Sequence, residues 1–195
     1  MERCKRGSTV KSVVHWNYEP GDFAEDTEED ILSNIRYGIG DRVLLIGDIG
    51  SLGKKLRLLG VHVTILENSA YQDVCYSLIF NENCSIVKGC LEMLPFEDKS
   101  FDKVVVLNHF NYTSNQQKAL KEIDRVLKLK GQLILEDSNL KKLKVKLKAF
   151  KHKVCGERIK YYYPQEIIAM FSKLNFSGTL EEIEREKYIY IGKKK

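Results

Sequence analysis

The chain has 195 residues, of which 43% are apolar and 30% are charged. This balance is typical of one globular domain that can bury a large core. No apolar run approaches the roughly 20 residues that a bilayer span needs, and the five cysteines form no CxxC pair. We therefore expect no membrane span, no metal site, no disulfide framework and a reducing, cytoplasmic setting.

The net charge of +5 is distributed unevenly along the chain. Segment 139–160 contains nine Lys or Arg residues and one Glu, which gives a local charge of +8. The remainder of the chain therefore carries a charge of −3. Because the basic character is regional, it indicates where an anionic partner would bind.

The N-terminal part is expected to be an arm followed by a helix. Residues 1–24 are mixed and aromatic, and Thr27 is a plausible N-cap. Apolar residues at helical spacing then continue to Gly38. We predict an arm and helix over 1–38 and a single domain over 39–195.

From residue 41 onward, short apolar runs alternate with amphipathic stretches. The predicted strands cover 41–47, 61–67, 84–89, 101–108, 131–137, 178–185 and 187–192. The predicted helices cover 52–60, 69–80, 114–128 (with Ser114 as N-cap), 140–154 and 163–176. This rhythm favours parallel pairing with right-handed crossovers, and hence a doubly wound α/β fold. Such sheets bind ligands at the carboxyl ends of their strands.

The stretch VLLIGDIGSLGKKL, residues 43–56, has the form of a ligand-binding loop between a strand and a helix. Its first glycine, Gly47, ends the strand, and Glu67 ends the next strand 20 residues later. An acid at that place can accept hydrogen bonds from both hydroxyls of a ribose. Together the two features predict a nucleoside-containing ligand.

Two longer motifs carry a family resemblance. LEMLPFEDKSFDKVVVLN covers 91–108, and KALKEIDRVLKLKGQLIL covers 118–135. Over about 40–137 the chain resembles small class I S-adenosylmethionine-dependent methyltransferases of the ubiquinone-biosynthesis (type 11) kind. The resemblance implies a Rossmann-like sheet of seven mostly parallel strands with an antiparallel last strand, and S-adenosylmethionine as cofactor.

The resemblance also implies roles for particular residues. The loop would face the methionine part of the cofactor, Glu67 and Asn68 the ribose, and Cys90 and Leu91 the adenine. Asn108 and His109 would lie near the methyl group, with His109 as the candidate catalytic base. The loop residues concerned are Gly47, Asp48, Ile49 and Gly50.

The loop also departs from the family pattern. Leu45 replaces an acid that usually precedes the first glycine, Ile49 replaces a glycine, and the spacing to Gly60 is one residue short. The Ile49 side chain is expected to fill space needed by the ligand. Cys90 stands where an Asp commonly binds adenine, and Asp48 is the nearest acid that could meet the cofactor's ammonium.

Several aromatic residues are candidates for the acceptor pocket: Trp16, Tyr18, Tyr112 and Tyr162. The arm residues Trp16 and Tyr18 could close over the cofactor or could only fasten the arm to the sheet.

The basic segment 140–160 is expected to be a lid. Leu140, Leu143, Leu147, Phe150 and Val154 form one apolar seam of a helix surrounded by lysines. Alternation at Leu143, Val145, Leu147 and Ala149 offers a competing strand interpretation. The lid could attract an anionic substrate, RNA or a membrane surface, or its lysines could be the solvated face of a packed helix.

The sequence therefore predicts methyl transfer to a small acceptor, which the lysines would favour if it is anionic. A methyltransferase-like binding or scaffold protein without catalysis is the first alternative, motivated by Leu45, Ile49 and Cys90. An RNA methyltransferase is the second, and nucleic acid is not the favoured partner. The sequence does not predict an oligomeric state.

Overall fold

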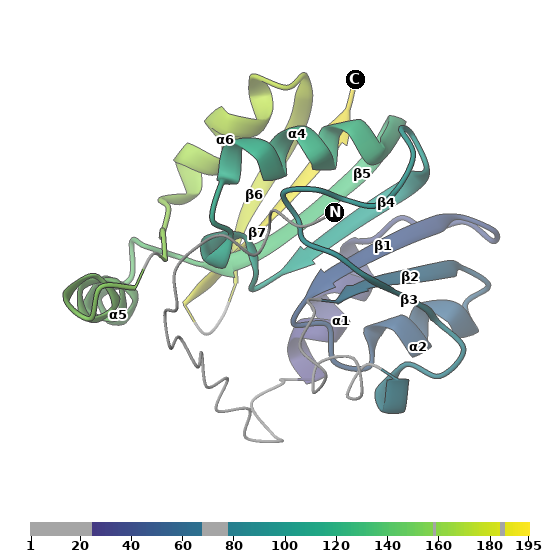
Figure 1. Cartoon of the computed structure of the whole chain (residues 1–195), viewed down its shortest axis with the longest axis horizontal. Coiled ribbons are helices and arrows are strands. Elements are labelled where there is room, and N and C mark those ends of the chain that lie inside the picture. The colour runs from purple at the N-terminus through teal and green to yellow at the C-terminus, as the bar shows by residue number, and fades with distance from the viewer. Residues whose placement is uncertain (1–24, 68–77, 158, 184–185) are drawn as a thin grey trace.

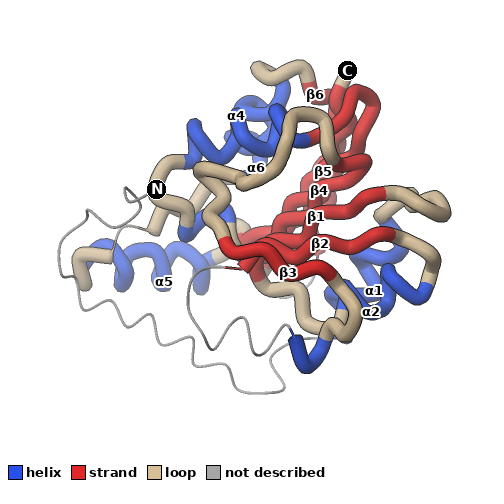
Figure 2. Tube along the Cα trace, turned by 45° about the vertical axis from the view of Figure 1, so that its right-hand side comes forward, coloured by secondary structure: helices blue, strands red, loops and turns tan. Residues whose placement is uncertain are grey.

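A computed structural model describes residues 25–67, 78–157, 159–183 and 186–195. Seven strands form one sheet in the order β3-β2-β1-β4-β5-β7-β6 (Figures 1 and 2). The strands are β1 (Arg42–Gly47), β2 (His62–Glu67), β3 (Ser85–Lys88), β4 (Phe101–Leu107), β5 (Leu127–Ser138), β6 (Phe176–Ile183) and β7 (Lys187–Lys194). The helices are α1 (Glu25–Asn34), α2 (Leu52–Leu58), α4 (Gln116–Val126), α5 (Leu143–Val154) and α6 (Pro164–Ser172), with a 3₁₀ turn η1 (Phe110–Tyr112).

Strand direction confirms the predicted fold class. β1 pairs in parallel with β2 and β4, β2 with β3, and β4 with β5. β7 runs antiparallel to both β5 and β6, so it alone opposes the other strands. The carboxyl ends of β1 to β5 therefore meet at one edge of the sheet, where the sequence places its candidate ligand residues.

The sheet is covered on both faces because the central strands are apolar on both sides. Leu44 and Ile46 of β1 join the core beneath α4 and α6. Val43 and Leu45 join the core beneath α1 and α2. Figure 1 shows the two helix layers on opposite sides of the sheet. A continuous apolar strand is the pattern that a doubly covered parallel sheet requires.

The motifs that carry the family resemblance form a structural network around Arg125 of α4. Its guanidinium donates to the carbonyl oxygens of Leu94 and Phe96 at 3.0 and 2.7 Å. It also pairs with the carboxylates of Asp98 and Glu122, both at 2.8 Å. Arg125 thereby lowers the pKa of Glu122. The LPF stretch and the following helix are thus fastened together, which holds the loop before β4 in place.

Some element boundaries differ from those predicted. α1 begins at Glu25, so Thr27 lies inside the helix rather than capping it. The N-cap of α4 is Asn115, whose side chain accepts from the Lys118 amide, and not Ser114. β5 begins at Leu127, directly after α4. Ser, Asn and neighbouring polar residues compete as caps, so sequence places helix ends only to within a few residues.

Residues 68–77 lie outside the described residues, and so does most of the helix predicted over 69–80. Residues 1–24 lie outside them as well, so the division into an arm and a domain stays a prediction. Within the described part of the chain, no helix has both the length and the apolar composition needed to cross a membrane.

α5 confirms the helical interpretation over residues 143–154 of the predicted 140–154 and contradicts the alternative of a packed helix. Four seam residues are largely exposed: Leu143 (73%), Leu147 (61%), Phe150 (67%) and Val154 (70%). Val145, which is outside the seam, is the buried residue of the helix. Figure 1 shows α5 set apart from the sheet, next to the carboxyl end of β5. The apolar face that the sequence reveals is turned away from the core.

Candidate functional site

Gly47 is required by the way the ends of β1 and β4 pack together. Its φ is +91°, and a Cβ there would lie 2.2 Å from the Leu107 carbonyl oxygen and 2.7 Å from Cβ of His109. The next residue, Asp48, donates its amide to the same Leu107 oxygen at 2.9 Å. A side chain at position 47 would force the two strand ends apart. The first glycine of the loop therefore brings the residues after β1 and β4 into contact.

Two apolar departures from the family pattern are core residues. Leu45 is fully buried and Ile49 is 4% exposed, and both pack beneath α1 and α2. Ile49 is not among the residues with positive φ. The expectation that its side chain fills ligand space is therefore wrong, because that side chain occupies the core. A β-branched residue is tolerated where the backbone turns without a left-handed conformation.

Two polar side chains that the sequence did not single out hold the glycine loop. Glu28 of α1 is 5% exposed and accepts hydrogen bonds from the Ser51 amide and hydroxyl at 2.8 and 2.9 Å. It also pairs with Lys55 of α2. Asn81 donates to the Gly50 carbonyl at 2.9 Å and accepts from the Lys54 amide at 3.1 Å. Neither Glu28 nor Asn81 belongs to a motif that would have marked it as a loop contact.

Asp48 and Asn108 lie next to each other, directly after the paired ends of β1 and β4. The Asn108 side chain lies close enough to the Asp48 carboxylate to favour its ionised form. Burial is the main cause that raises the pKa of Asp48 to about 6, against the opposing effects of Lys187 and Asn108. Asn108 itself adopts a φ of +46°, a conformation that Asn tolerates better than most residues. The loop therefore contains a carboxylate that is mainly ionised at neutral pH and loses its charge just below it.

The carboxyl end of β5 adds two more buried acids, Glu136 and Asp137. The Glu136 carboxylate is fully buried and pairs with Lys187 of β7 at 2.7 Å. Asp137 is also fully buried and accepts from the amides of Asn111 and Ser138 at 2.9 and 2.8 Å. Burial raises the pKa of Asp137 to about 7 and also raises that of Glu136. Glu136 and Lys187 carry no motif, and only the antiparallel return of β7 brings them together.

His109 and Tyr112 flank the turn after β4. Burial lowers the pKa of His109 below its usual value, which keeps the imidazole neutral at neutral pH. The Tyr112 and Tyr161 phenols influence each other's pKa, and burial raises the pKa of both. Tyr162 instead packs near Phe110, with the ring centroids 6.0 Å apart. Tyr161 is therefore the neighbour of Tyr112, while the predicted pocket role of Tyr162 stays a prediction.

The predicted ribose and adenine residues lie at the same sheet edge. β1 and β2 pair in register with Ile46 opposite Leu66, so Gly47 and Glu67 end the two strands side by side. The Glu67 carbonyl accepts from the Gly89 amide at 2.9 Å, which brings Cys90 close to the end of β2. Leu91 is fully buried in the core. Asn68, Trp16 and Tyr18 lie outside the described residues, so their predicted roles stay predictions.

The residues at this edge fit a nucleoside cofactor with a charged amino-acid tail. Gly47 and Gly50 have φ values of +91° and +50°, a left-handed conformation that glycine adopts without strain and that turns the chain sharply at the end of β1. Glu67 can accept from ribose hydroxyls, and Asp48 can face an ammonium. The chemistry of this donor set therefore matches the cofactor that the sequence resemblance implies.

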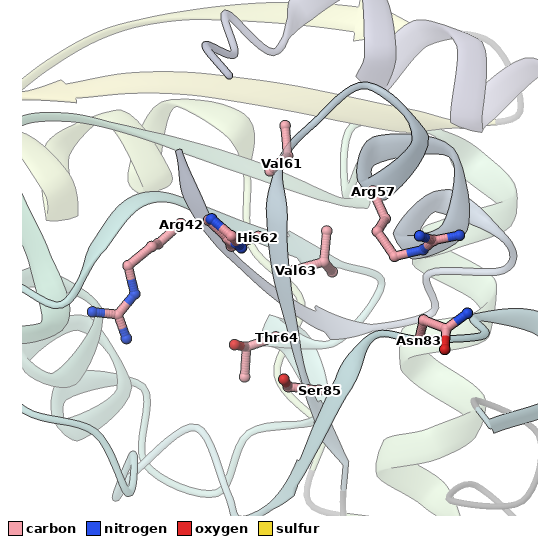
Figure 3. Close-up of a pocket in the computed structure, with 8 residues that line it drawn as sticks. All are labelled: Arg42, Arg57, Val61, His62, Val63, Thr64, Asn83 and Ser85. Carbon is pink, nitrogen blue, oxygen red and sulfur yellow. The ribbon is translucent and has the colours of Figure 1, made fainter. Parts of the chain in front are cut away.

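A separate depression of about 360 Å³ lies at the opposite, amino ends of β1 and β2. It is lined by Arg42, Arg57, Val61, His62, Val63, Thr64, Asn83 and Ser85 (Figure 3). The guanidinium groups of Arg42 and Arg57 point away from each other in this view, so they do not converge on one anion. Its lining residues include neither a glycine nor an acidic side chain, so it does not resemble the site at the carboxyl ends of the strands.

Comparison with known proteins shows that the chain is similar to methyltransferases. Residues 47–135 match a family described as "Methyltransferase domain". Sterol 4-C-methyltransferase strm-1 of Caenorhabditis elegans is 33% identical over 104 residues, covering 53% of this chain and 30% of that protein. The chloroplastic 2-methyl-6-phytyl-1,4-hydroquinone methyltransferase of Spinacia oleracea is 30% identical over 133 residues, covering 64% and 38%. The chain thus spans about a third of the length of these curated relatives.

Solved structures show the same fold. A methyltransferase-like protein from Bacillus halodurans, described as a putative methyltransferase, matches with a TM-score of 0.73 and 14% identity, covering 87% of this chain and 99% of that one. A complex between the Haloferax volcanii Trm112 methyltransferase activator and a putative methyltransferase matches with a TM-score of 0.71 and 18% identity, covering 86% and 88%.

Proposed function

We propose that this chain, which carries a class I S-adenosylmethionine-dependent methyltransferase domain, methylates a small acceptor whose nucleophile loses a proton during transfer. S-adenosylmethionine is the cofactor of that domain. The observation that carries the proposal is the contact between the ends of β1 and β4. There the Asp48 carboxylate lies beside the Asn108 side chain, and His109 lies against Gly47. The ionised carboxylate of Asp48 and the neutral imidazole of His109 thus lie at the same carboxyl end of the sheet.

Each residue has a defined task in this proposal. Asp48 faces the ammonium of the cofactor, and Glu67 accepts hydrogen bonds from the ribose hydroxyls. The bound cofactor supplies a methyl group already activated by a sulfonium, so alignment and desolvation are the main requirements. His109 accepts the proton that the acceptor's nucleophile loses as the methyl group is transferred. Its lowered pKa keeps the imidazole available as a base.

The acceptor is proposed only as a class. The relatives are named for a sterol, for a phytylated hydroquinone and, in Actinopolyspora halophila, for glycine, sarcosine and dimethylglycine. Their domains therefore serve acceptors of different chemistry. The buried acids at the end of β5 favour a reacting end that is neutral or cationic, and an anionic group would have to lie further out, toward the lysines of α5.

The non-catalytic alternative rests on the altered loop. Leu45 and Ile49 motivated it, but both side chains are accommodated in the core. The Cys90 substitution still removes a strong partner for adenine. Binding of cofactor without transfer to any acceptor would favour this alternative.

Cofactor binding is tested by calorimetric titration of S-adenosylmethionine between pH 5 and 8. We expect affinity to fall as the pH drops through about 6, because Asp48 then becomes protonated and loses its charge. Asp48→Asn should weaken binding about tenfold at pH 7.5 and flatten the pH dependence. The exposed acid Glu97, changed to Gln, is the matched control. Absence of binding at millimolar cofactor would overturn the proposal.

The catalytic role of His109 is tested by transfer of a labelled methyl group to phenolic, amine and RNA acceptors. His109→Gln should retain cofactor affinity and lose transfer by a factor of about 10². Equal transfer by wild type and variant would remove His109 from the mechanism. Transfer to RNA in place of the small acceptors would establish the RNA methyltransferase alternative.

A further inference from the structure

We propose that α5 is an interfacial helix that binds this protein to the surface of an anionic lipid bilayer. The helix has 12 residues, LKVKLKAFKHKV, which corresponds to about 18 Å of length. Its four large exposed side chains, at positions 143, 147, 150 and 154, follow spacings of four, three and four residues. At about 100° per residue these positions fall within an arc of about 60°. They form one continuous apolar stripe, which we call the α5 stripe.

The opposite side of α5 is the side that contacts the rest of the protein. Val145 is 5% exposed, and Ala149 and His152 are partly buried. The His152 ring lies 6.0 Å from the Tyr161 ring, measured between centroids. These three positions lie on the side of the helix away from the stripe. The helix is therefore fixed to the body by its narrow inner face, and the stripe is the outer face.

Lysines border the α5 stripe on both sides. On the same angular scale, Lys144 and Lys151 flank one edge and Lys146 and Lys153 flank the other. Lys144 pairs with Glu186 at 3.5 Å. Among the residues that the structure describes, no acidic side chain pairs with Lys146, Lys151 or Lys153. Their charges are available to a partner.

This arrangement matches the chemistry of a bilayer surface. An interfacial helix buries its apolar face among the acyl chains, while long basic side chains at the edges reach the lipid headgroups. Anionic headgroups add attraction for each nearby lysine. An RNA backbone would match the lysines but would leave the four apolar side chains in water. A second copy seated on the stripe would bring its own lysine borders against these, at an electrostatic cost.

The position of α5 orients the molecule on the bilayer. Figures 1 and 2 show α5 beyond the carboxyl end of β5, the end of the sheet at which the candidate site lies. The segment after α5 returns to that site, where the Lys160 amide donates to the Asn111 carbonyl at 3.0 Å. A bilayer beneath α5 would therefore lie on the same side of the protein as the candidate site.

The test is co-sedimentation of the full chain with vesicles of phosphatidylcholine alone or with 30% phosphatidylglycerol. Wild type should bind the anionic vesicles at least tenfold more tightly than the neutral ones, and binding should weaken at high salt. Changing Leu143, Leu147 and Phe150 to Ser should reduce binding to anionic vesicles at least tenfold. The matched control changes three exposed apolar residues elsewhere to Ser, namely Ile39, Leu58 and Leu129, which are 92%, 68% and 60% exposed.

A second variant tests the lysine borders without changing the stripe. Changing Lys146, Lys151 and Lys153 to Gln should remove most of the preference for anionic vesicles, whereas the same change at Lys54, Lys118 and Lys121 should not. The proposal is overturned if wild type does not bind anionic vesicles, or if the serine variant binds as well as wild type. It is also overturned if wild type is a dimer that the serine variant converts to monomer, because the occupant would then be a second copy.

Discussion

Helices α4 and α5 are nearly equal in length and similar in their pattern of apolar residues, but one apolar stripe is buried and the other is exposed. Both carry large apolar residues at helical spacing, three and three in α4 and four, three and four in α5. In α4 the stripe that contains Leu120, Ile123 and Val126 is buried against the sheet. In α5 the stripe that contains Leu147 and Phe150 is exposed. Helical periodicity thus identifies an apolar face in both cases, but it does not say whether the protein's own core covers it.

The largest expected effect on the free energy of unfolding is at the centre of the buried stripe of α4. Ile123→Ala should lower the free energy of unfolding by about 2–4 kcal/mol, because it removes apolar volume from a fully buried position. Leu147→Ala on α5 should change it by less than about 0.5 kcal/mol. Urea denaturation of both variants measures the difference. Equal losses would show that the α5 stripe is buried in solution.

A smaller effect is expected from the charged residues of the two helices. Arg125→Ala in α4 should cost about 2 kcal/mol, because Glu122 and two backbone carbonyls lose a charged donor. Since the pKa of Glu122 is lowered in the folded state, this contribution is complete above pH 4.5 and is lost as the pH falls through the lowered pKa. Lys148→Ala in α5 should be neutral at every pH. Denaturation at pH 7 and at pH 3 distinguishes the two.

The smallest of the three predicted losses of stability is expected on the inner face of α5. Val145→Ala should cost about 1 kcal/mol, because the residue is 5% exposed but lies on a helix with little other burial. Hydrogen exchange should show α5 opening more readily than α4 in the wild type, and Val145→Ala should increase that difference. Protection of α5 equal to that of α4 would contradict the comparison.

Much of the fold could be predicted because its signals are local. Apolar runs such as Val43–Ile46, the following glycines and the regular alternation with helices indicated the doubly wound sheet, and the antiparallel last strand followed from the family resemblance. The class I methyltransferase assignment, based on the 91–108 and 118–135 motifs, is confirmed. Helix caps were predicted less well, because several polar residues compete at each helix end.

The candidate site was predictable only in part. Gly47, Asp48 and Asn108 were expected to lie together because they end adjacent parallel strands, and the structure brings them together. Glu28 and Asn81 hold the loop from distant segments, and Glu136 meets Lys187 across an antiparallel pair. No spacing rule links such residues, because their contact depends on the order of strands in the finished sheet.

The sequence by itself determined the sheet, the edge at which the cofactor residues gather and the existence of an amphipathic basic helix. These features depend on hydrophobic periodicity, on the positions of the strand ends and on glycines at places where the backbone is left-handed. Only the tertiary structure decided that Ile49 enters the core, that Tyr161 lies beside Tyr112, and that the α5 stripe faces outward. The physical reason is that a side chain's environment is set by whichever segments pack against it, and these are distant in the sequence.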